Sequence, residues 1–119
     1  MENRGAQHRR ERLADALRDE IGAILEGDLA DPRVGLATVN EVLLPSDGKS
    51  ARVMIHVEGS ESEGEETIAG LNAAKGFIRH QVLERLGLRH VPELFFYLDY
   101  SQQYKGRVEE LLKRIKKRR

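Results

Sequence analysis

Residues 72–79 read Asn-Ala-Ala-Lys-Gly-Phe-Ile-Arg and lie in the middle of a long helical pattern. Apolar residues recur three to four positions apart over 68–71, before this stretch, and over 77–86, after it. Gly76 interrupts the pattern, and a glycine inside a helix costs about 1 kcal/mol relative to alanine. The stretch therefore predicts two helices joined by a kink at Ala74-Lys75-Gly76. From these residues alone, Gly76 fits a close packing of two elements as well as a break that exposes backbone N–H groups to phosphate.

The elements on either side of the kink follow from periodicity and turn residues. Residues 51–58 alternate apolar and polar side chains, as a half-buried strand does, and the Asp-Gly turn within 45–48 makes this strand the second of an antiparallel hairpin. Gly87 is placed to end the helix after the kink, with Leu88 as its hydrophobic follower. In chain order we expect a helix at about 8–26, strands at 34–44 and 51–58, the two kinked helices, a strand at 93–99 and a helix at about 101–116.

This order predicts an α+β fold in which helices cover one face of a three-stranded sheet. With 119 residues, the chain has enough length for one core. We expect residues 1–100 to form a KH-like RNA-binding domain with a flexible start at 1–7, and residues 101–119 to form a C-terminal basic helix and tail. The order αββααβ is that of a type II KH domain, which binds single-stranded RNA.

Charge is balanced in total but not along the chain. Twenty basic residues face twenty acidic ones. Residues 58–66 carry five glutamates and no basic residue, whereas residues 105–119 carry eight basic residues and two acidic ones. Such segregation concentrates positive potential on part of the surface. The alternative is a solvated charged surface with a basic tail.

Several classes of protein are disfavoured by the composition. No run of about 18 apolar residues is present, so we expect no membrane span. The chain has no cysteine, which excludes a disulfide scaffold and a thiolate zinc site, and it starts without the apolar stretch of a signal peptide. The four histidines are scattered and no nucleophile or phosphate-loop motif occurs. We therefore expect a cytoplasmic protein that is not an enzyme and needs no cofactor.

The candidate binding residues are basic side chains near the kink and near the two ends of the chain. Arg33 could contact RNA or satisfy carbonyls at the end of the first helix. Phe95 and Tyr97 could stack on bases, although packing in the core or at the sheet edge is favoured by the low aromatic content of 5%. The candidates for RNA contact are Arg9, Arg10, Arg33, Ala74, Lys75, Gly76, Arg79, His80, Arg85, Arg89, Lys113, Lys116 and Lys117.

Three stretches resemble the ribosome-binding factor A family. They are residues 21–29 followed by Asp31-Pro32-Arg33-Val34-Gly35, residues 72–79, and residues 91–96, which read Val-Pro-Glu-Leu-Phe-Phe. The resemblance extends from about Arg9 to Leu112. In that family an Ala-x-Gly kink replaces the Gly-x-x-Gly loop of other KH domains, and Ala74-Lys75-Gly76 matches it. Leu43 and Leu44 depart from the family pattern, which leaves the local strand register open.

The resemblance implies a function as well as a fold. It implies a monomeric, non-enzymatic factor that binds the immature 30S subunit and assists maturation of 16S rRNA at its 5′ end. It also implies release with the help of a ribosome-associated GTPase. The alternative is a general KH-like RNA-binding module, or an adaptor that docks on a protein, without specificity for the ribosome.

Overall fold

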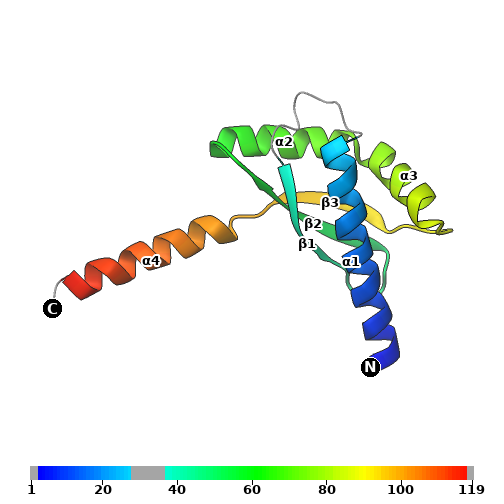
Figure 1. The fold of residues 1–119 in the computed structure, drawn as a ribbon, viewed down its shortest axis with the longest axis horizontal. Helices are drawn as coiled ribbons and strands as arrows, with labels where there is room; N and C mark the ends of the chain where they lie inside the picture. The colour runs from blue at the N-terminus through cyan, green and yellow to red at the C-terminus, as the bar shows by residue number, and fades with distance from the viewer. Residues whose placement is uncertain (1–2, 28–36, 118–119) are drawn as a thin grey trace.

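The computed structural model describes residues 3–27 and 37–117. Its elements are α1 (Arg4–Gly27), β1 (Ala37–Leu43), β2 (Ser50–Val57), α2 (Glu61–Ala73), α3 (Lys75–Leu86), β3 (Glu93–Leu98) and α4 (Ser101–Lys117) (Figure 1). The predicted α+β class and element order are confirmed. α1 starts earlier than about residue 8, because the Asn3 side chain accepts a hydrogen bond from Ala6 N at 2.8 Å and caps the first turn. The predicted start of the first strand, residues 34–36, lies outside the described residues.

The sheet has the order β1-β2-β3, with β1 antiparallel to β2 and β2 parallel to β3. The predicted hairpin turn is confirmed, since Gly48 has a φ of 65° and its N–H donates to Pro45 O at 3.0 Å. A bulge between Val39 and Glu41 shifts the register of β1 and places Leu43 opposite Arg52. Strand β3 is parallel to β2 because α2 and α3 carry the chain back across the sheet.

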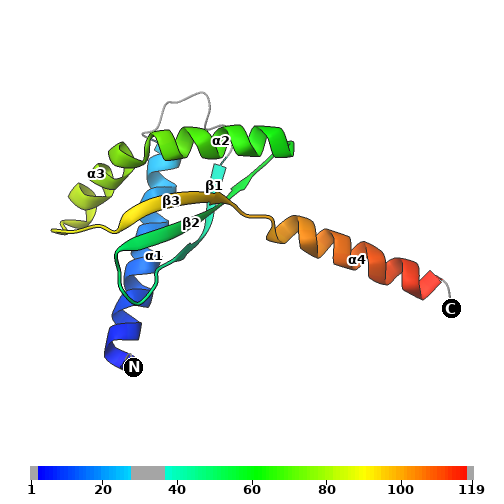
Figure 2. The same ribbon diagram turned by 180° about the vertical axis from the view of Figure 1, so that it is seen from behind.

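One face of the sheet is covered by α1, α2 and α3, and the core lies between these helices and the strands. Seen from the opposite side, the sheet lies in front of α1 (Figure 2). The strand predicted at 51–58 behaves as its alternation requires, because Ala51, Val53 and Ile55 are fully buried while Arg52 is exposed. The fully or almost fully buried side chains of the core are Leu17, Ile21, Ile24, Val42, Ala51, Val53, Ile55, Leu71, Ile78, Val82, Val91, Leu94 and Phe96.

The start of α2 and the end of α3 are both capped, the second by the glycine that the sequence predicts there. The Ser60 hydroxyl accepts a hydrogen bond from Glu63 N at 3.2 Å, which caps α2. Gly87 ends α3 with a left-handed φ of 62°, and Leu88 N donates to Leu83 O at 3.2 Å. Leu88 also packs against the core, as expected for the residue after such a cap.

Helix α4 points away from the rest of the molecule (Figures 1 and 2). Its large apolar side chains are therefore more than half exposed, at 54% for Val108 and 57% for Ile115. At about 100° per residue, Val108, Leu111, Leu112 and Ile115 share one side of the helix and the basic residues lie around them. Among the described residues, no helix is long and apolar enough to cross a membrane.

Candidate nucleic-acid interface

The kink is a single residue, Ala74, between two regular helices. Ala74 has φ −95° and ψ 5°, and its N–H donates to the carbonyls of Gly70 and Leu71 at 3.1 Å each. The bond from Ile78 N to Ala74 O, at 3.0 Å, closes the first turn of α3. Ala74 provides no side-chain cap, and the N–H groups of a first turn have no partner inside their own helix. An anion at this position is favoured by those donors and by the helix dipole.

Gly76 lies in the first turn of α3 and is exposed. A Cβ built on Gly76 would meet nothing within 4 Å, and its φ is not among the positive ones. Neither packing nor backbone conformation therefore requires glycine at this position. Close packing of two elements, one of the two explanations open from the sequence, is wrong for Gly76.

Asn72 fixes the end of α2 against the sheet. Its side-chain Nδ2 donates to Phe96 O at 3.1 Å, and its Oδ1 accepts from Phe96 N at 3.1 Å. Strand β3 is an edge strand of the sheet, so this pair of bonds satisfies backbone groups that would otherwise lack a partner. The end of α2 is thereby held beside the middle of β3.

A hollow opens at the kink and collects residues from three elements. It is lined by Lys49, Lys75, Gly76, Arg79, Glu93 and Leu94. Lys49 belongs to the β1–β2 hairpin. It is held beside the hollow because its carbonyl accepts a hydrogen bond from Glu93 N at 3.0 Å. Lys75 Nζ lies 3.6 Å from Glu93 Oε1 and 4.8 Å from the centre of the Phe95 ring. Three cations against one carboxylate give the hollow a net charge of +2.

The acidic residues of α2 lie at the other end of that helix. All four of them, Glu61, Glu63, Glu65 and Glu66, are in its first half, whereas the hollow lies beyond its last residue, Ala73. Glu66, the nearest of them along the chain, is nine residues from Lys75, which is about 13 Å of helix and exceeds the screening length of about 8 Å at physiological salt. The glutamates therefore leave the positive potential of the hollow largely intact.

Arg79 lines the hollow but is engaged by the protein itself. Its Nε and Nη2 donate to Val91 O at 2.9 and 2.7 Å. The guanidinium thus ties the first half of α3 to the segment before β3. This contact gives Arg79 a role in holding the hollow together as well as contributing charge to it.

Other predicted residues of α3 lie beyond the hollow. His80 Nε2 lies 3.0 Å from Glu84 Oε1, and Arg85 Nη1 lies 3.7 Å from Glu20 Oε2 on α1. Arg89 is exposed in the segment after α3. Because α3 has 12 residues, its ends are about 18 Å apart, so Arg85 and Arg89 lie well away from Lys75.

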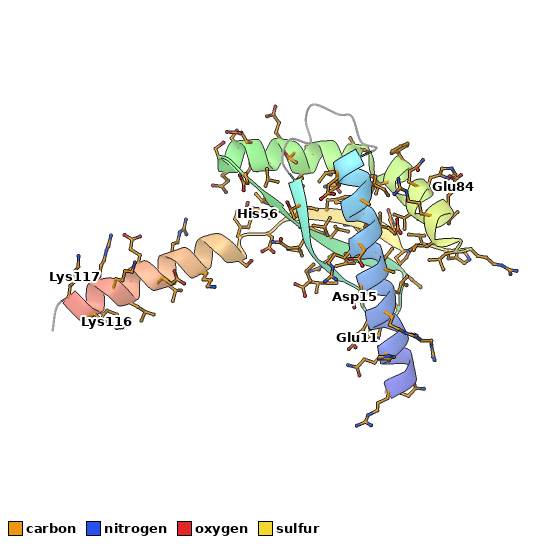
Figure 3. The ribbon with its side chains drawn as sticks, viewed as in Figure 1. Glu11, Asp15, His56, Glu84, Lys116 and Lys117 are labelled. Atoms are coloured by element: carbon orange, nitrogen blue, oxygen red, sulfur yellow. The ribbon has the colours of Figure 1, made fainter. Side chains whose placement is uncertain are left out.

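The remaining candidates are at the two ends of the chain and outside the hollow. Arg9 is exposed and Arg10 half-buried near the start of α1, at the end of the molecule remote from α2. Lys113, Lys116 and Lys117 are exposed on α4, and the last two lie at the opposite end of the molecule from Glu84 (Figure 3). Arg33 falls outside the described residues. The structure thus brings together Lys75, Gly76 and Arg79 and leaves the other basic residues in separate groups.

Sequence reasoning missed the contribution of the sheet. Lys49 was not singled out, and Phe95 and Tyr97 were expected to pack in the core or at the edge. Core packing is wrong for Tyr97, which is 45% exposed, whereas its neighbours Leu94 and Phe96 are 1% and 2% exposed; the other alternative, the sheet edge, agrees with the place of β3 as an edge strand. The alternation along residues 93–98 gave the two faces of the strand, but only the position of the helices shows which face is open.

A carboxylate at the end of β3 sets the start of α4. Asp99 Oδ1 accepts from Ser101 N at 2.9 Å, and Asp99 Oδ2 accepts from Asn40 Nδ2 at 3.1 Å. The bond from Ser101 N–H, and then the one from the Asn40 amide, hold the pKa of Asp99 below its ordinary value. The carboxylate therefore joins the bulge of β1 to the first turn of α4.

The fold and the hollow define a small α+β domain with a mixed three-stranded sheet, helices on one face and a cationic hollow at a helix kink. A profile of the family described as Ribosome-binding factor A matches residues 9–112. A protein of that name from Koribacter versatilis is 60% identical over 119 residues, which is 100% of this chain and 97% of the relative. Another from Thermomicrobium roseum is 41% identical over 94% of this chain and 87% of its own length. The chain belongs to the ribosome-binding factor A family.

Solved structures of the same family share the fold. The solution structure of a Thermotoga maritima protein described as a putative ribosome binding factor A has a TM-score of 0.67 and 32% identity, and the match covers 75% of this chain and 85% of that one. A Thermus thermophilus ribosome binding factor A, fitted as a homology model into the cryo-EM map of a 30S complex, has a TM-score of 0.58 and 30% identity. That match covers 79% of this chain and 94% of that one.

Proposed function

We propose that this protein binds the immature 30S subunit and assists late maturation of its 16S rRNA, including processing at the 5′ end, without catalysing a step itself. The observation that carries the proposal is the hollow at the kink, where Lys49, Lys75 and Arg79 surround the exposed Gly76. Family membership supports the ribosome as the partner. The Thermus thermophilus relative, fitted into the map of a 30S complex, supports the small subunit in particular.

The hollow is suited to the phosphate backbone of RNA. Cationic side chains and the first-turn donors of α3 attract phosphate without reading a sequence. Lys75 must exchange Glu93 for phosphate, and an exposed ion pair of this kind contributes only about 0–1 kcal/mol. A backbone phosphate of RNA, which carries one negative charge, can therefore replace Glu93 as the partner of Lys75 at little cost.

Binding alone is sufficient for such a function. A protein that binds one arrangement of the rRNA more tightly than another shifts the rRNA toward the first. We propose that the chain acts in the cytoplasm as a monomer and holds the 5′ region of 16S rRNA in an arrangement that processing enzymes accept. We further propose that a ribosome-associated GTPase helps to release the protein from the mature small subunit.

Hydroxyl-radical footprinting of immature small subunits, with and without the protein, tests this directly. We expect protection of nucleotides in the 5′ region of 16S rRNA, and loss of that protection when Lys49 and Lys75 are both changed to alanine. In cells that lack the protein, precursor with an unprocessed 5′ end should accumulate, and wild-type protein should restore processing. Protection confined to other regions of 16S rRNA would exclude the 5′-end assignment.

A second measurement separates RNA binding from docking on a protein. Binding to small subunits should weaken steeply between low and moderate salt and should be reduced by competing RNA. Binding that survives ribonuclease digestion of the particle, with retention of the ribosomal proteins, would show an adaptor instead.

A further inference from the structure

The open face of the sheet presents two rows of side chains that cross all three strands. The register places Leu43, Arg52 and Phe95 in one row and Glu41, Met54 and Tyr97 in the next. The burial alternation shows that these side chains face away from the helices, with Leu43 at 42% and Tyr97 at 45% exposed. The helices cover only the other face (Figures 1 and 2). Aromatic, apolar and cationic groups are thus gathered on an uncovered surface.

Each aromatic ring on this face has a cation beside it. Lys75 Nζ lies 4.8 Å from the centre of the Phe95 ring, and Arg52 Cζ lies 5.7 Å from the centre of the Tyr97 ring. Lys75 also lines the hollow at the kink, so the aromatic rows are continuous with the proposed phosphate site. Arg52 lines a second hollow at the hairpin, together with Leu43, Leu44, Pro45 and Ser50.

We propose that this open face is a stacking platform on which Phe95 and Tyr97 hold unpaired bases of single-stranded RNA. The inference rests on the proposed function and adds a second kind of contact to it. Sites for single-stranded nucleic acid combine aromatic side chains that stack on bases with cations that follow the phosphates. Phe95 and Tyr97 supply the first component, and Lys75 and Arg52 supply the second.

The cations now beside the rings do not block this use. Cation–π contacts at exposed sites are weak, and stacking of a base on an aromatic ring is stronger. Lys75 and Arg52 are long and flexible, so each can move from the ring to a phosphate of the same nucleotide chain. Glu93 and Glu41 lie on this face too, which disfavours phosphate near them and directs bases toward the rings.

The spacing of the rings selects the form of RNA. Phe95 and Tyr97 are two residues apart on one strand, which separates them by about 6.6 Å. Successive nucleotides along one strand of a duplex are about 3.4 Å apart. Neighbouring bases can therefore occupy both rings only if the strand is extended and unstacked. A duplex is disfavoured because its bases already stack on one another and leave no face free for either ring.

The test compares the two rings with a matched aromatic residue elsewhere. Phe77 on α3 is 46% exposed, nearly the same as Tyr97, but it does not belong to the sheet. Affinity for a short fluorescein-labelled single-stranded RNA and for immature small subunits is measured for wild type, Phe95→Leu, Tyr97→Leu and Phe77→Leu. We expect each sheet variant to bind both partners at least about fivefold more weakly and Phe77→Leu to bind as wild type does.

Salt dependence distinguishes stacking from charge. The sheet variants should lose affinity without a change in the slope of log affinity against log salt, whereas Lys75→Gln should reduce that slope. Tyr97→Phe keeps the ring and should retain affinity. If Phe95→Leu fails to fold, Tyr97→Leu and Tyr97→Phe carry the comparison, because Tyr97 is outside the core.

Three results would overturn the platform. In the first, the sheet variants bind single-stranded RNA and small subunits as wild type does, while Lys75→Gln still binds small subunits poorly. That result would exclude the platform and leave the proposed function intact. Another is equal loss in Phe77→Leu, which would place the aromatic contact at the first turn of α3 or show a general effect of removing exposed aromatic surface. The third is a wild-type protein that binds small subunits but binds a labelled duplex of the same sequence more tightly than the single-stranded RNA, or binds no single-stranded RNA. That result would point to an RNA helix or a ribosomal protein as the occupant.

Discussion

Replacing Gly76 by alanine should make the protein more stable and a poorer ligand of the small subunit. A Cβ at this position would meet nothing within 4 Å, and the backbone is not in the left-handed region. The change therefore adds helix propensity without strain and should raise the free energy of unfolding by up to about 1 kcal/mol. For a chain of 119 residues this corresponds to an increase in Tm of about 3–5 °C.

The same methyl group stands where RNA is proposed to approach. Gly76 lines the hollow with Lys75 and Arg79, so a side chain there keeps phosphate away from the first turn of α3. A hydrogen bond to a charged group contributes about 1.5–3 kcal/mol, and its loss should lower affinity about tenfold or more. Urea unfolding and sedimentation with immature small subunits measure the two effects separately.

Gly22 provides the control. It lies inside α1, and a Cβ there would also meet nothing within 4 Å, so Gly22→Ala should stabilise without affecting binding. If Gly76→Ala lowers the free energy of unfolding, the conclusion that position 76 does not require glycine is wrong. If it raises stability and binding is unchanged, RNA does not approach Gly76 closely.

Three further changes test the structure around the site. Arg79→Ala removes both bonds to Val91 O and should lower the free energy of unfolding by about 1–3 kcal/mol in urea titration, and a loss below about 0.5 kcal/mol would contradict the anchoring role. Because the folded pKa of Asp99 is lowered, its contribution to stability is present at neutral pH and is lost as the pH falls through that pKa. Thermal melts should therefore show wild type more stable than Asp99→Asn near neutral pH and the difference shrinking in acid, whereas a constant difference would refute the linkage. Deleting residues 101–119 should leave Tm almost unchanged, because the described side chains of α4 are exposed, and should weaken small-subunit binding most at low salt; a large fall in Tm would reveal packing of α4 on the body.

Local signals in the sequence were sufficient for the elements of the fold. The alternation over 51–57 identified the central strand, and its apolar positions are the buried ones. Gly87 marked the end of the helix after the kink because its role depends only on neighbouring residues. The kink at Ala74 followed from a glycine in a helical pattern, although the structure shows that Gly76 itself is under no steric constraint.

Features that depend on how distant segments pack together could not be predicted from local patterns in the sequence. The bulge beside Asn40 breaks no local pattern, yet it decides that Leu43 faces outward and Leu44 inward. Arg79 was expected to contact RNA, but its hydrogen bonds to Val91 O form only when β3 returns beside α3. Lys49 lines the hollow because β2 and β3 are parallel neighbours in the sheet. That pairing of strands could not be predicted from the sequence.

The central claim, that the hollow at the kink grips the immature small subunit, is tested most directly by reversing one charge in it. Lys75→Glu is compared with Arg18→Glu on α1, since the two side chains are similarly exposed at 40% and 45% and both face carboxylates. Sedimentation with immature small subunits should show about tenfold or greater loss for Lys75→Glu, a shallower salt slope, and little change for Arg18→Glu. Equal binding by the two variants, with both folded, would place the binding surface elsewhere on the molecule.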